Sequence, residues 1–127
     1  TSSAASDVYK RQHMPLTSET KNLLNYSIFK KMKKNSIIVN TARGGIINEI
    51  DLEKALNENL LFGAGLDVFS NEPIEKDNPL LKNKKVILSP HSATFTNECT
   101  SRMGIETTKN IIYFFEKKID KSMIINL

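Results

Sequence analysis

The sequence contains one cysteine, no tryptophan and no long hydrophobic run, and only three of its eighteen basic residues are arginine. Because Cys99 stands alone, it cannot form an internal disulfide. This fits a reducing compartment and leads us to expect a cytoplasmic protein. No stretch approaches the roughly 18 consecutive apolar residues that a membrane-spanning helix requires. We therefore expect no membrane partner.

The scarcity of arginine also bears on the net charge of +4. The positive charge is mostly lysine, spread over residues 30–34, 82–85 and 116–121. A nucleic-acid-binding surface more often places arginine and aromatic side chains along one stripe. The lysines instead fall at expected helix ends and in expected surface loops, where they favour the negative end of a helix dipole. We therefore predict a solvated, lysine-rich face and no nucleic-acid partner.

Several motifs of known chemistry are also missing. The sequence has no G-x-G-x-x-G followed by an acidic residue, no Walker loop and no G-x-S-x-G. If the fold binds a dinucleotide, the half that grips the phosphates is not in this sequence. The two histidines, His13 and His91, have no third clustered ligand and make a poor transition-metal site. Cys99 fits a plain buried or half-buried thiol.

The chain does contain short apolar runs that alternate with helical patterns. Residues 37–39 carry no charge, as in a strand covered by helices on both sides. Residues 62–69 and 86–89 are expected strands as well, and residues 122–127 could add a small closing strand. Strand, helix, strand, connection, strand and helix in this order predict an α/β fold with a parallel sheet and helical crossovers.

Three helices are expected from the spacing of apolar residues. The first follows an N-cap at Thr17 or Ser18 and continues past Phe29. The second has Asn48 as its N-cap, with Asp51 at the reciprocal capping position. The third runs roughly over 97–117. Residues 1–12 show no periodicity that would hold a helix or strand. The expected core-facing residues are Ile50, Leu52, Ala55 and Leu56 in the second helix, and Met103, Ile111, Phe114 and Phe115 in the third.

Chemically useful side chains follow each expected strand. Arg43 comes shortly after the first, Asp67 and Glu72 follow the second, and His91 follows the third. Ligands of open parallel sheets lie at the carboxyl ends of the strands. We therefore expect these residues to share one edge of the sheet and to form a site.

Each of these residues also has an ordinary structural interpretation. Arg43 alone could be a surface arginine, Glu72 a solvated loop carboxylate and His91 a turn histidine. Together they fit a better-defined chemistry. Glycines 44 and 45, expected at a helix start, would let an anion approach backbone N–H groups beside the arginine fork. A carboxylate bonded to an imidazole makes an acid–base pair that works near neutral pH.

The order of these motifs resembles that of the D-isomer-specific 2-hydroxyacid dehydrogenases, a family that includes D-3-phosphoglycerate dehydrogenase. The matching stretches are HMPLTSETKNLLN (13–25), FKKMKKNSIIVNTARGGIINEIDLEKAL (29–56), GAGLDVFSNEP (63–73), NPLL (78–81) and SPHSATFTNE (89–98). NTARGG, LDVF-x-x-EP and PH-x-A are highly specific in combination. The serine of His-Ser-Ala, in place of a more apolar residue, is a mild departure from the family.

The resemblance implies a role for each matching residue. Arg43 would bind the substrate carboxylate, His91 would exchange a proton with the 2-hydroxyl group and Glu72 would keep His91 protonated. Asp67 would meet the nicotinamide amide. The implied catalytic residues are Arg43, Glu72 and His91, and the implied cofactor-binding residues are His13, Pro15, Thr17, Thr41, Ala42, Arg43, Asp67, His91 and Ala93.

The resemblance also implies an architecture. We expect the second half of a Rossmann-like, parallel-sheet NAD-binding domain over 13–103, and a C-terminal helix and tail over 104–127 that return toward an absent substrate domain. Residues 1–12 stand where the family has a buried strand, and we expect them to be a non-native or disordered leader. The cofactor would be NAD, with NADP open, and the substrate a small 2-hydroxy or 2-keto acid whose identity the sequence leaves undecided.

The full-length protein would be a homodimer. As a fragment, the present chain would be inactive alone. Two other functions remain open at this point: a non-catalytic NAD(H)-sensing regulatory module of the same fold, and a phosphate-binding α/β domain. The first uses the same fold without turnover, and the second leaves the pairing of Glu72 with His91 without a purpose.

Overall fold

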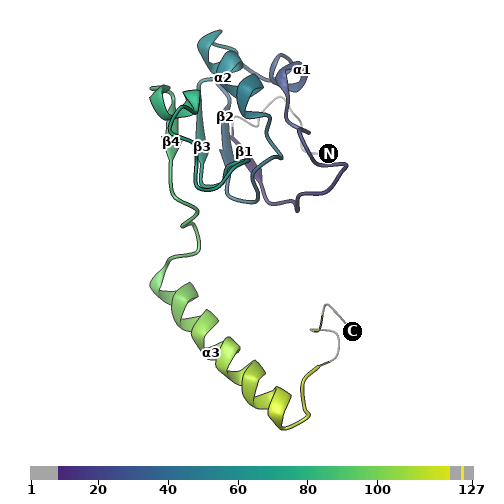
Figure 1. Ribbon diagram of the computed structural model, residues 1–127. Coiled ribbons are helices and arrows are strands. Elements are labelled where there is room, and N and C mark those ends of the chain that lie inside the picture. Colours follow the sequence, from purple (N-terminus) through teal and green to yellow (C-terminus); the bar gives the residue numbers. More distant parts are fainter. Residues whose placement is uncertain (1–8, 121–123, 125–127) are drawn as a thin grey trace. The chain divides into compact units, whose positions relative to one another are not determined.

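The computed structural model describes residues 9–120 and residue 124 (Figure 1). The chain divides after Ala93 into two compact units, and each is described here by itself. The division that the sequence predicts, into 13–103 and 104–127, stays a prediction.

The first unit is built on a sheet of four parallel strands, ordered β1-β2-β3-β4 (Figure 1). The parallel α/β fold predicted from the sequence is therefore confirmed. Leu66 pairs with Asn40 on one side and with Leu88 on the other, so the carboxyl ends of three strands lie level. The elements of this unit are β1 (Tyr9–Gln12), α1 (Tyr26–Phe29), β2 (Ile37–Asn40), α2 (Glu49–Asn57), β3 (Gly63–Leu66), the 3-10 helix η1 (Pro79–Lys82) and β4 (Val86–Leu88).

The core lies on one face of this sheet. In β2, Ile38 and Asn40 are buried while Ile37 and Val39 are only half-buried, which is the alternation of a strand with one packed face. Burying an apolar side chain such as that of Ile38 fully contributes about 1.5–3 kcal/mol. The core cluster consists of Leu24, Phe29, Ile38, Ile47, Leu52, Ala55, Leu56, Leu61, Ala64, Leu66, Phe69 and Leu80.

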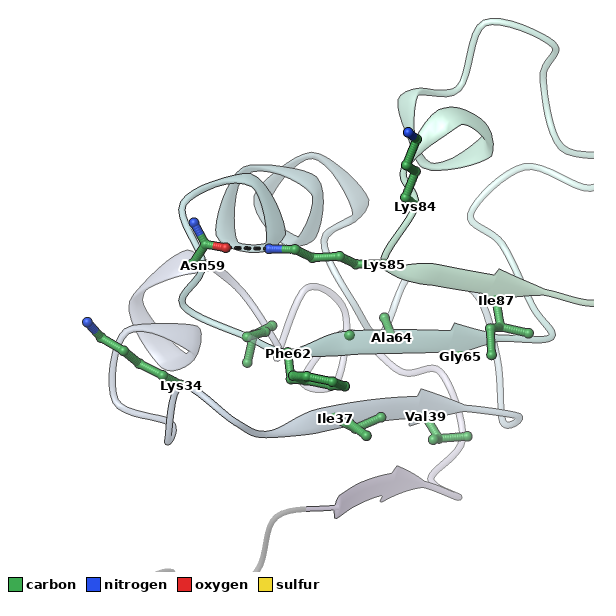
Figure 2. Close-up of a pocket in the computed structure, with 12 residues that line it drawn as sticks. Lys34, Ile37, Val39, Asn59, Phe62, Ala64, Gly65, Lys84, Lys85 and Ile87 are labelled. Carbon is green, nitrogen blue, oxygen red and sulfur yellow. Dashed lines mark hydrogen bonds between the residues drawn. The ribbon is translucent and has the colours of Figure 1, made fainter.

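The opposite face of the sheet holds an open hollow of about 660 Å³ over β2, β3 and β4 (Figure 2). Phe62 and Ile87 line it with 67% and 79% of their surfaces exposed. Lys34 and Lys84 also line it. The sequence predicts a covered strand at 37–39, but among the described residues only one of its faces is packed.

Strand β1 corrects the expectation that residues 1–12 hold no helix or strand, while the non-native origin of these residues stays a prediction. Tyr9–Gln12 pairs in parallel with Ile37–Asn40, although these four residues carry no strand pattern of their own. Pairing with β2 stabilises the extended conformation of these residues, although their own strand propensity is weak. The remaining eight residues of the expected leader lie outside the described part of the chain.

The first expected helix is much shorter than its apolar spacing suggests. Thr17 and Thr20 bond to each other's backbone N–H groups and form a turn instead of a cap. Helix α1 begins only after Asn25, whose side chain accepts hydrogen bonds from Ser27 and Ile28. The competing side-chain turn explains why Thr17 and Ser18 were wrong as helix caps.

The second helix is close to its prediction. Asn48 is the N-cap and accepts a hydrogen bond from the N–H of Asp51. The Asp51 carboxylate does not complete a capping box but accepts from the N–H of Tyr26 in α1. Leu52, Ala55 and Leu56 are buried as expected, whereas Ile50 is 76% exposed. Ile50 lies two residues from Leu52, a spacing that a helix does not place on one face.

The second unit contains helix α3 (Asn97–Phe115), capped by the side chain of Thr96. The predicted bounds are close, but none of its described residues is buried. Its expected core residues are all exposed, because this unit contains no second helix or sheet among the described residues. The expected closing strand at 122–127 lies outside the described residues, apart from Ile124. No helix in the described part of the chain combines the length and apolarity needed to span a membrane.

Candidate active site

The candidate residues follow three neighbouring strand ends. Thr41, Ala42 and Arg43 come directly after β2, Asp67 after β3, and His91 three residues after β4 ends. Because the ends of β2, β3 and β4 are level in register, these residues share one edge of the sheet, as predicted.

Asp67 organises the segment that carries His91. Its side chain is only 3% exposed. Oδ1 accepts hydrogen bonds from the Ser89 hydroxyl at 2.5 Å and from the Ser92 N–H at 2.8 Å, and Oδ2 accepts from the Ala93 N–H at 2.8 Å. Burial raises the pKa of Asp67, but these three hydrogen bonds and the nearby His91 outweigh it and hold the pKa below its ordinary value. The carboxylate therefore stays ionised and brackets His91 from both sides.

The backbone of His91 has a left-handed conformation, with φ of 52°. Such a conformation is uncommon outside glycine, although asparagine, aspartate and histidine adopt it more readily than most residues. The hydrogen bonds that the Ser89 hydroxyl and the Ser92 N–H donate to Asp67 hold the chain on either side of this position. These bonds hold the backbone from which the imidazole projects at the strand end.

Glu72 and His91 form a pair. Glu72 Oε2 lies 2.7 Å from His91 Nδ1, and Glu72 Oε1 accepts a hydrogen bond from the Phe69 N–H at 2.9 Å. The bond to His91, followed by the one from Phe69, lowers the pKa of Glu72. An ionised carboxylate can only accept, so His91 carries a proton on Nδ1 and presents Nε2 to the surroundings. The two side chains are 36% and 50% exposed and so remain reachable.

Arg43 is held through its backbone. The buried Asn40 side chain donates to the Arg43 carbonyl at 2.9 Å and accepts from the Ala42 N–H at 3.1 Å. The guanidinium is exposed and donates one hydrogen bond, at 2.6 Å, to the Ala42 carbonyl. A guanidinium has five N–H donors in a planar fork. Arg43 therefore has donors to spare for an anion.

Glycine is needed at positions 44 and 45 for a different reason from the one that the sequence suggests. Helix α2 begins at Glu49, so these glycines lie in a turn and not at a helix start. A β-carbon on Gly44 would lie 1.7 Å from the Phe69 carbonyl oxygen, and Gly45 has a positive φ of 78°. Close contact between two loops and a left-handed turn explain the glycines, without requiring an anion at their N–H groups.

Five of the expected cofactor residues line one hollow of about 540 Å³: His13, Pro15, Thr41, Ala42 and Arg43. Thr17 is not among the lining residues, and its side chain bonds with Thr20 in a turn. Asp67, His91 and Ala93 gather instead at the ends of β3 and β4. Glu72 and His91 line a second hollow of about 440 Å³ with Phe69, Pro73, Ile74 and Pro90. Within the described residues, no group of histidine, cysteine or acidic side chains could hold a metal ion.

Two polar residues that support the site were not predicted to belong to it. Asn40 anchors Arg43, and Ser89 donates to Asp67. Both directly follow or end a strand at the edge where ligands bind, and that position is the sequence signal that could have identified them. The single cysteine, Cys99, is half-buried as expected.

Comparison with known proteins yields one family. Residues 4–93 match the model of the D-isomer specific 2-hydroxyacid dehydrogenase, NAD binding domain. A glyoxylate reductase of Korarchaeum cryptofilum is 42% identical over 112 residues, which cover 88% of this chain and 34% of that protein. A D-3-phosphoglycerate dehydrogenase of Archaeoglobus fulgidus is 41% identical over 109 residues, which cover 86% of this chain and 20% of that protein.

Solved structures with a similar fold include members of the same family. The NAD-complexed D-isomer specific 2-hydroxyacid dehydrogenase of Lactobacillus delbrueckii ssp. bulgaricus superposes with a TM-score of 0.84 at 27% identity, over 92% of this chain and 40% of that one. The D-lactate dehydrogenase of Aquifex aeolicus, complexed with NAD and lactic acid, superposes with a TM-score of 0.78 at 28% identity. The match covers 87% of this chain and 38% of that one. The chain thus spans about a third of the length of the curated glyoxylate reductases that it matches.

Proposed function

The chain belongs to the D-isomer specific 2-hydroxyacid dehydrogenase family, and we propose that the complete protein oxidises or forms a D-2-hydroxy acid with a nicotinamide cofactor. Its relatives include glyoxylate reductases and a D-3-phosphoglycerate dehydrogenase. Because the chain covers a minor part of their length, activity, substrate and partners are proposed for the complete protein. The observation that carries the proposal is the pairing of Glu72 with His91 at the strand edge.

Our assignment of NAD rests on the hollow beside β2. Its volume of about 540 Å³ falls in the range of small-molecule sites. Its walls combine the apolar ring of Pro15, the small Ala42 and the cation of Arg43, which suit a partly apolar ring that carries polar groups. NAD, when bound, supplies the acceptor or donor of hydride. Relatives have been solved with NAD or with NADPH, and NADP is the alternative cofactor.

His91 is the proposed acid–base residue. Because Glu72 occupies Nδ1, the proton exchanged with the substrate moves at Nε2. When the hydroxy acid is oxidised, Nε2 would accept the hydroxyl proton, and the C2 hydrogen would leave as a hydride for which the bound cofactor is the acceptor. The substrate thus loses two electrons and two protons in all. In the reverse direction Nε2 returns the proton to the carbonyl oxygen. Glu72 stabilises the positive charge that the imidazole gains.

Arg43 is the proposed carboxylate-binding residue. Its guanidinium fork matches the two oxygens of a carboxylate. Asn40 fixes the backbone from which it projects. We propose that the substrate carboxylate binds this fork, which would hold C2 and its oxygen between Arg43 and His91.

The family resemblance assigns Asp67 a contact with the nicotinamide amide. Since three hydrogen bonds already occupy its oxygens, this contact would use the remaining lone pair of Oδ2. The primary role that the geometry supports for Asp67 is to hold the segment around His91.

The test is turnover by the complete protein with NAD or NADP and a panel of D- and L-2-hydroxy acids. The D-isomers should be oxidised, and His91→Ala should lower kcat by about 10²–10⁴-fold, the usual contribution of a positioned acid–base. Near-normal turnover by His91→Ala would remove His91 from this role. Binding of NADH without turnover of any D-isomer would instead favour the regulatory module.

Two further proposals concern the chain and its assembly. The purified 127-residue chain should show no turnover, because a site without its opposing wall does not exclude water from the reacting groups. Turnover by this chain alone would contradict that proposal. The complete protein should be a homodimer, which its mass in solution by light scattering would test.

A further inference from the structure

The loop over 70–78 carries Glu72, and of its residues only Ile74 packs against the core cluster. Of its nine residues only Ile74 and Asn78 are not exposed. An exposed loop of this kind has little packing to fix its position. Yet Glu72 must reach His91 Nδ1 at 2.7 Å to act as its partner. The position of Glu72 therefore depends on the bond from the Phe69 N–H, on the packing of Ile74 against the core and on the bonds that hold the ends of the loop.

One carboxylate outside the loop binds both of its ends. Glu49 Oε1 accepts a hydrogen bond from the Ser70 N–H at 2.6 Å, and Glu49 Oε2 accepts from the Asn78 side-chain amide at 2.8 Å. These donors are the first and last residues of the loop. Glu49 closes the loop with two charge-assisted hydrogen bonds, which are stronger than neutral ones.

Glu49 is itself firmly placed. It is the first residue of α2, whose Leu52 and Leu56 are fully buried in the core. At the other end, Asn78 accepts from the Leu80 N–H at 3.0 Å and so caps η1, which buries Leu80. Glu49 thus connects two anchored helices across the base of the loop.

One hydrogen bond links this closure to Glu72, and two others hold the far side of the loop. Ser70, bound by Glu49, directly follows Phe69, whose N–H donates to Glu72 Oε1 at 2.9 Å. A shift of Ser70 would therefore be passed along the backbone to the Phe69 N–H. On the other side, the Asn71 side chain donates to Glu75 at 2.8 Å, and Asn78 N–H donates to the Glu75 carbonyl at 3.0 Å.

We propose that Glu49 is a positioning residue that sets the distance between Glu72 and His91 by holding both ends of the loop. The proposal rests on the proposed function insofar as that distance matters for turnover. If Glu49 only stabilised the start of α2, a negative charge near the positive end of the helix dipole would be enough. It would not require each oxygen to bind a different end of the same loop.

The experiment is a double-mutant cycle on kcat in the complete protein. Glu49→Ala should lower kcat about 10-fold, since small misplacements of catalytic groups are costly, and should change the KM for the cofactor little. In Glu72→Ala, the further change Glu49→Ala should have almost no effect, because the partner that Glu49 positions is gone. If the double mutant instead loses kcat by the product of the two single losses, the residues act independently and the proposal is overturned.

Glu53→Ala is the matched control. Glu53 lies one turn further along the same helix, and its carboxylate bonds to the Asn57 side chain of that helix. Its replacement removes the same charge from α2 without touching the loop, and kcat should stay unchanged. A loss equal to that of Glu49→Ala would assign the effect to the helix and overturn the proposal.

Hydrogen exchange measured by mass spectrometry tests the loop without any activity. The peptide over 69–78 should exchange faster in Glu49→Ala than in the wild-type protein or Glu53→Ala. If the complete protein has no dehydrogenase activity, the proposed function fails while this measurement still decides the role of Glu49. Where Glu49→Ala does not fold, Glu49→Gln keeps the acceptor for Ser70 and loses the one for Asn78. The peptide over 69–78 should then exchange faster in Glu49→Gln than in the wild-type protein, and unchanged exchange would overturn the proposal.

Discussion

A β-carbon added to Gly44 would lie 1.7 Å from the carbonyl oxygen of Phe69. The loop that carries Arg43 and the loop that leads to Glu72 are therefore in backbone contact. No real β-carbon tolerates such a distance, and the neighbouring atoms are backbone atoms that cannot rotate away.

Gly44→Ala should therefore destabilise the first unit by about 1–3 kcal/mol, the usual cost of overpacking, and should lower turnover of the complete protein. Urea unfolding measures the first effect. Gly65→Ala is the control, since its β-carbon would meet only Val39, at 3.8 Å. Equal stability of Gly44→Ala and the wild type would show that the two loops can separate.

Asp67→Asn should weaken the bracket around His91. Asparagine keeps one acceptor oxygen but replaces the other with an NH₂ group, which cannot accept from the Ser92 or Ala93 N–H. Leaving one such donor unsatisfied costs about 1–3 kcal/mol. We expect that loss in urea unfolding at pH 7, together with a lower kcat. Loss of stability without any change in kcat would separate Asp67 from the placement of His91.

Acid should remove part of the stability of the first unit. The pKa values of Asp67 and Glu72 lie below their ordinary values of 3.8 and 4.5. The stabilisation from these carboxylates is complete above the ordinary values and is lost as the pH falls through the lower, folded ones. Thermal unfolding should show the wild type losing stability below about pH 4 and Asp67→Asn losing less. Equal losses in both proteins would assign the acid dependence to other groups.

Arg43→Lys should raise the KM for the 2-keto acid by about 10–100-fold, because an ammonium group cannot form two parallel bonds with a carboxylate. The affinity for the cofactor should change less. Arg102→Lys, in exposed helix α3, is the control. An unchanged KM in Arg43→Lys would place the substrate carboxylate elsewhere.

The sequence predicts the parts of the fold whose signal is local. Strands β2, β3 and β4 have apolar residues, and Asn48 is a strong helix cap, so these elements were expected. Strand β1 was missed because Tyr9–Gln12 is held by pairing with β2. The long first helix was wrong because Thr17 and Thr20 form their own turn.

The candidate site, too, could be predicted only where the signal is local. Arg43, Asp67, Glu72 and His91 could be placed at one edge because each follows a strand of a parallel sheet. The contact between Gly44 and Phe69 could not, because it joins loops that are far apart in the sequence. Nor could the two bonds of Glu49, which depend on the fold of a nine-residue loop.

The hollow on the open face of the sheet has a consequence for handling the protein. Lys34 and Lys84 lie at the margins of the hollow that the exposed Phe62 and Ile87 line, so copies that approach through this face bring like charges together (Figure 2). Salt screens that repulsion, with a Debye length of about 8 Å at physiological ionic strength, but leaves the apolar attraction in place. The 127-residue chain should therefore self-associate more as salt is added, which light scattering would detect, and Phe62→Ser should reduce the association.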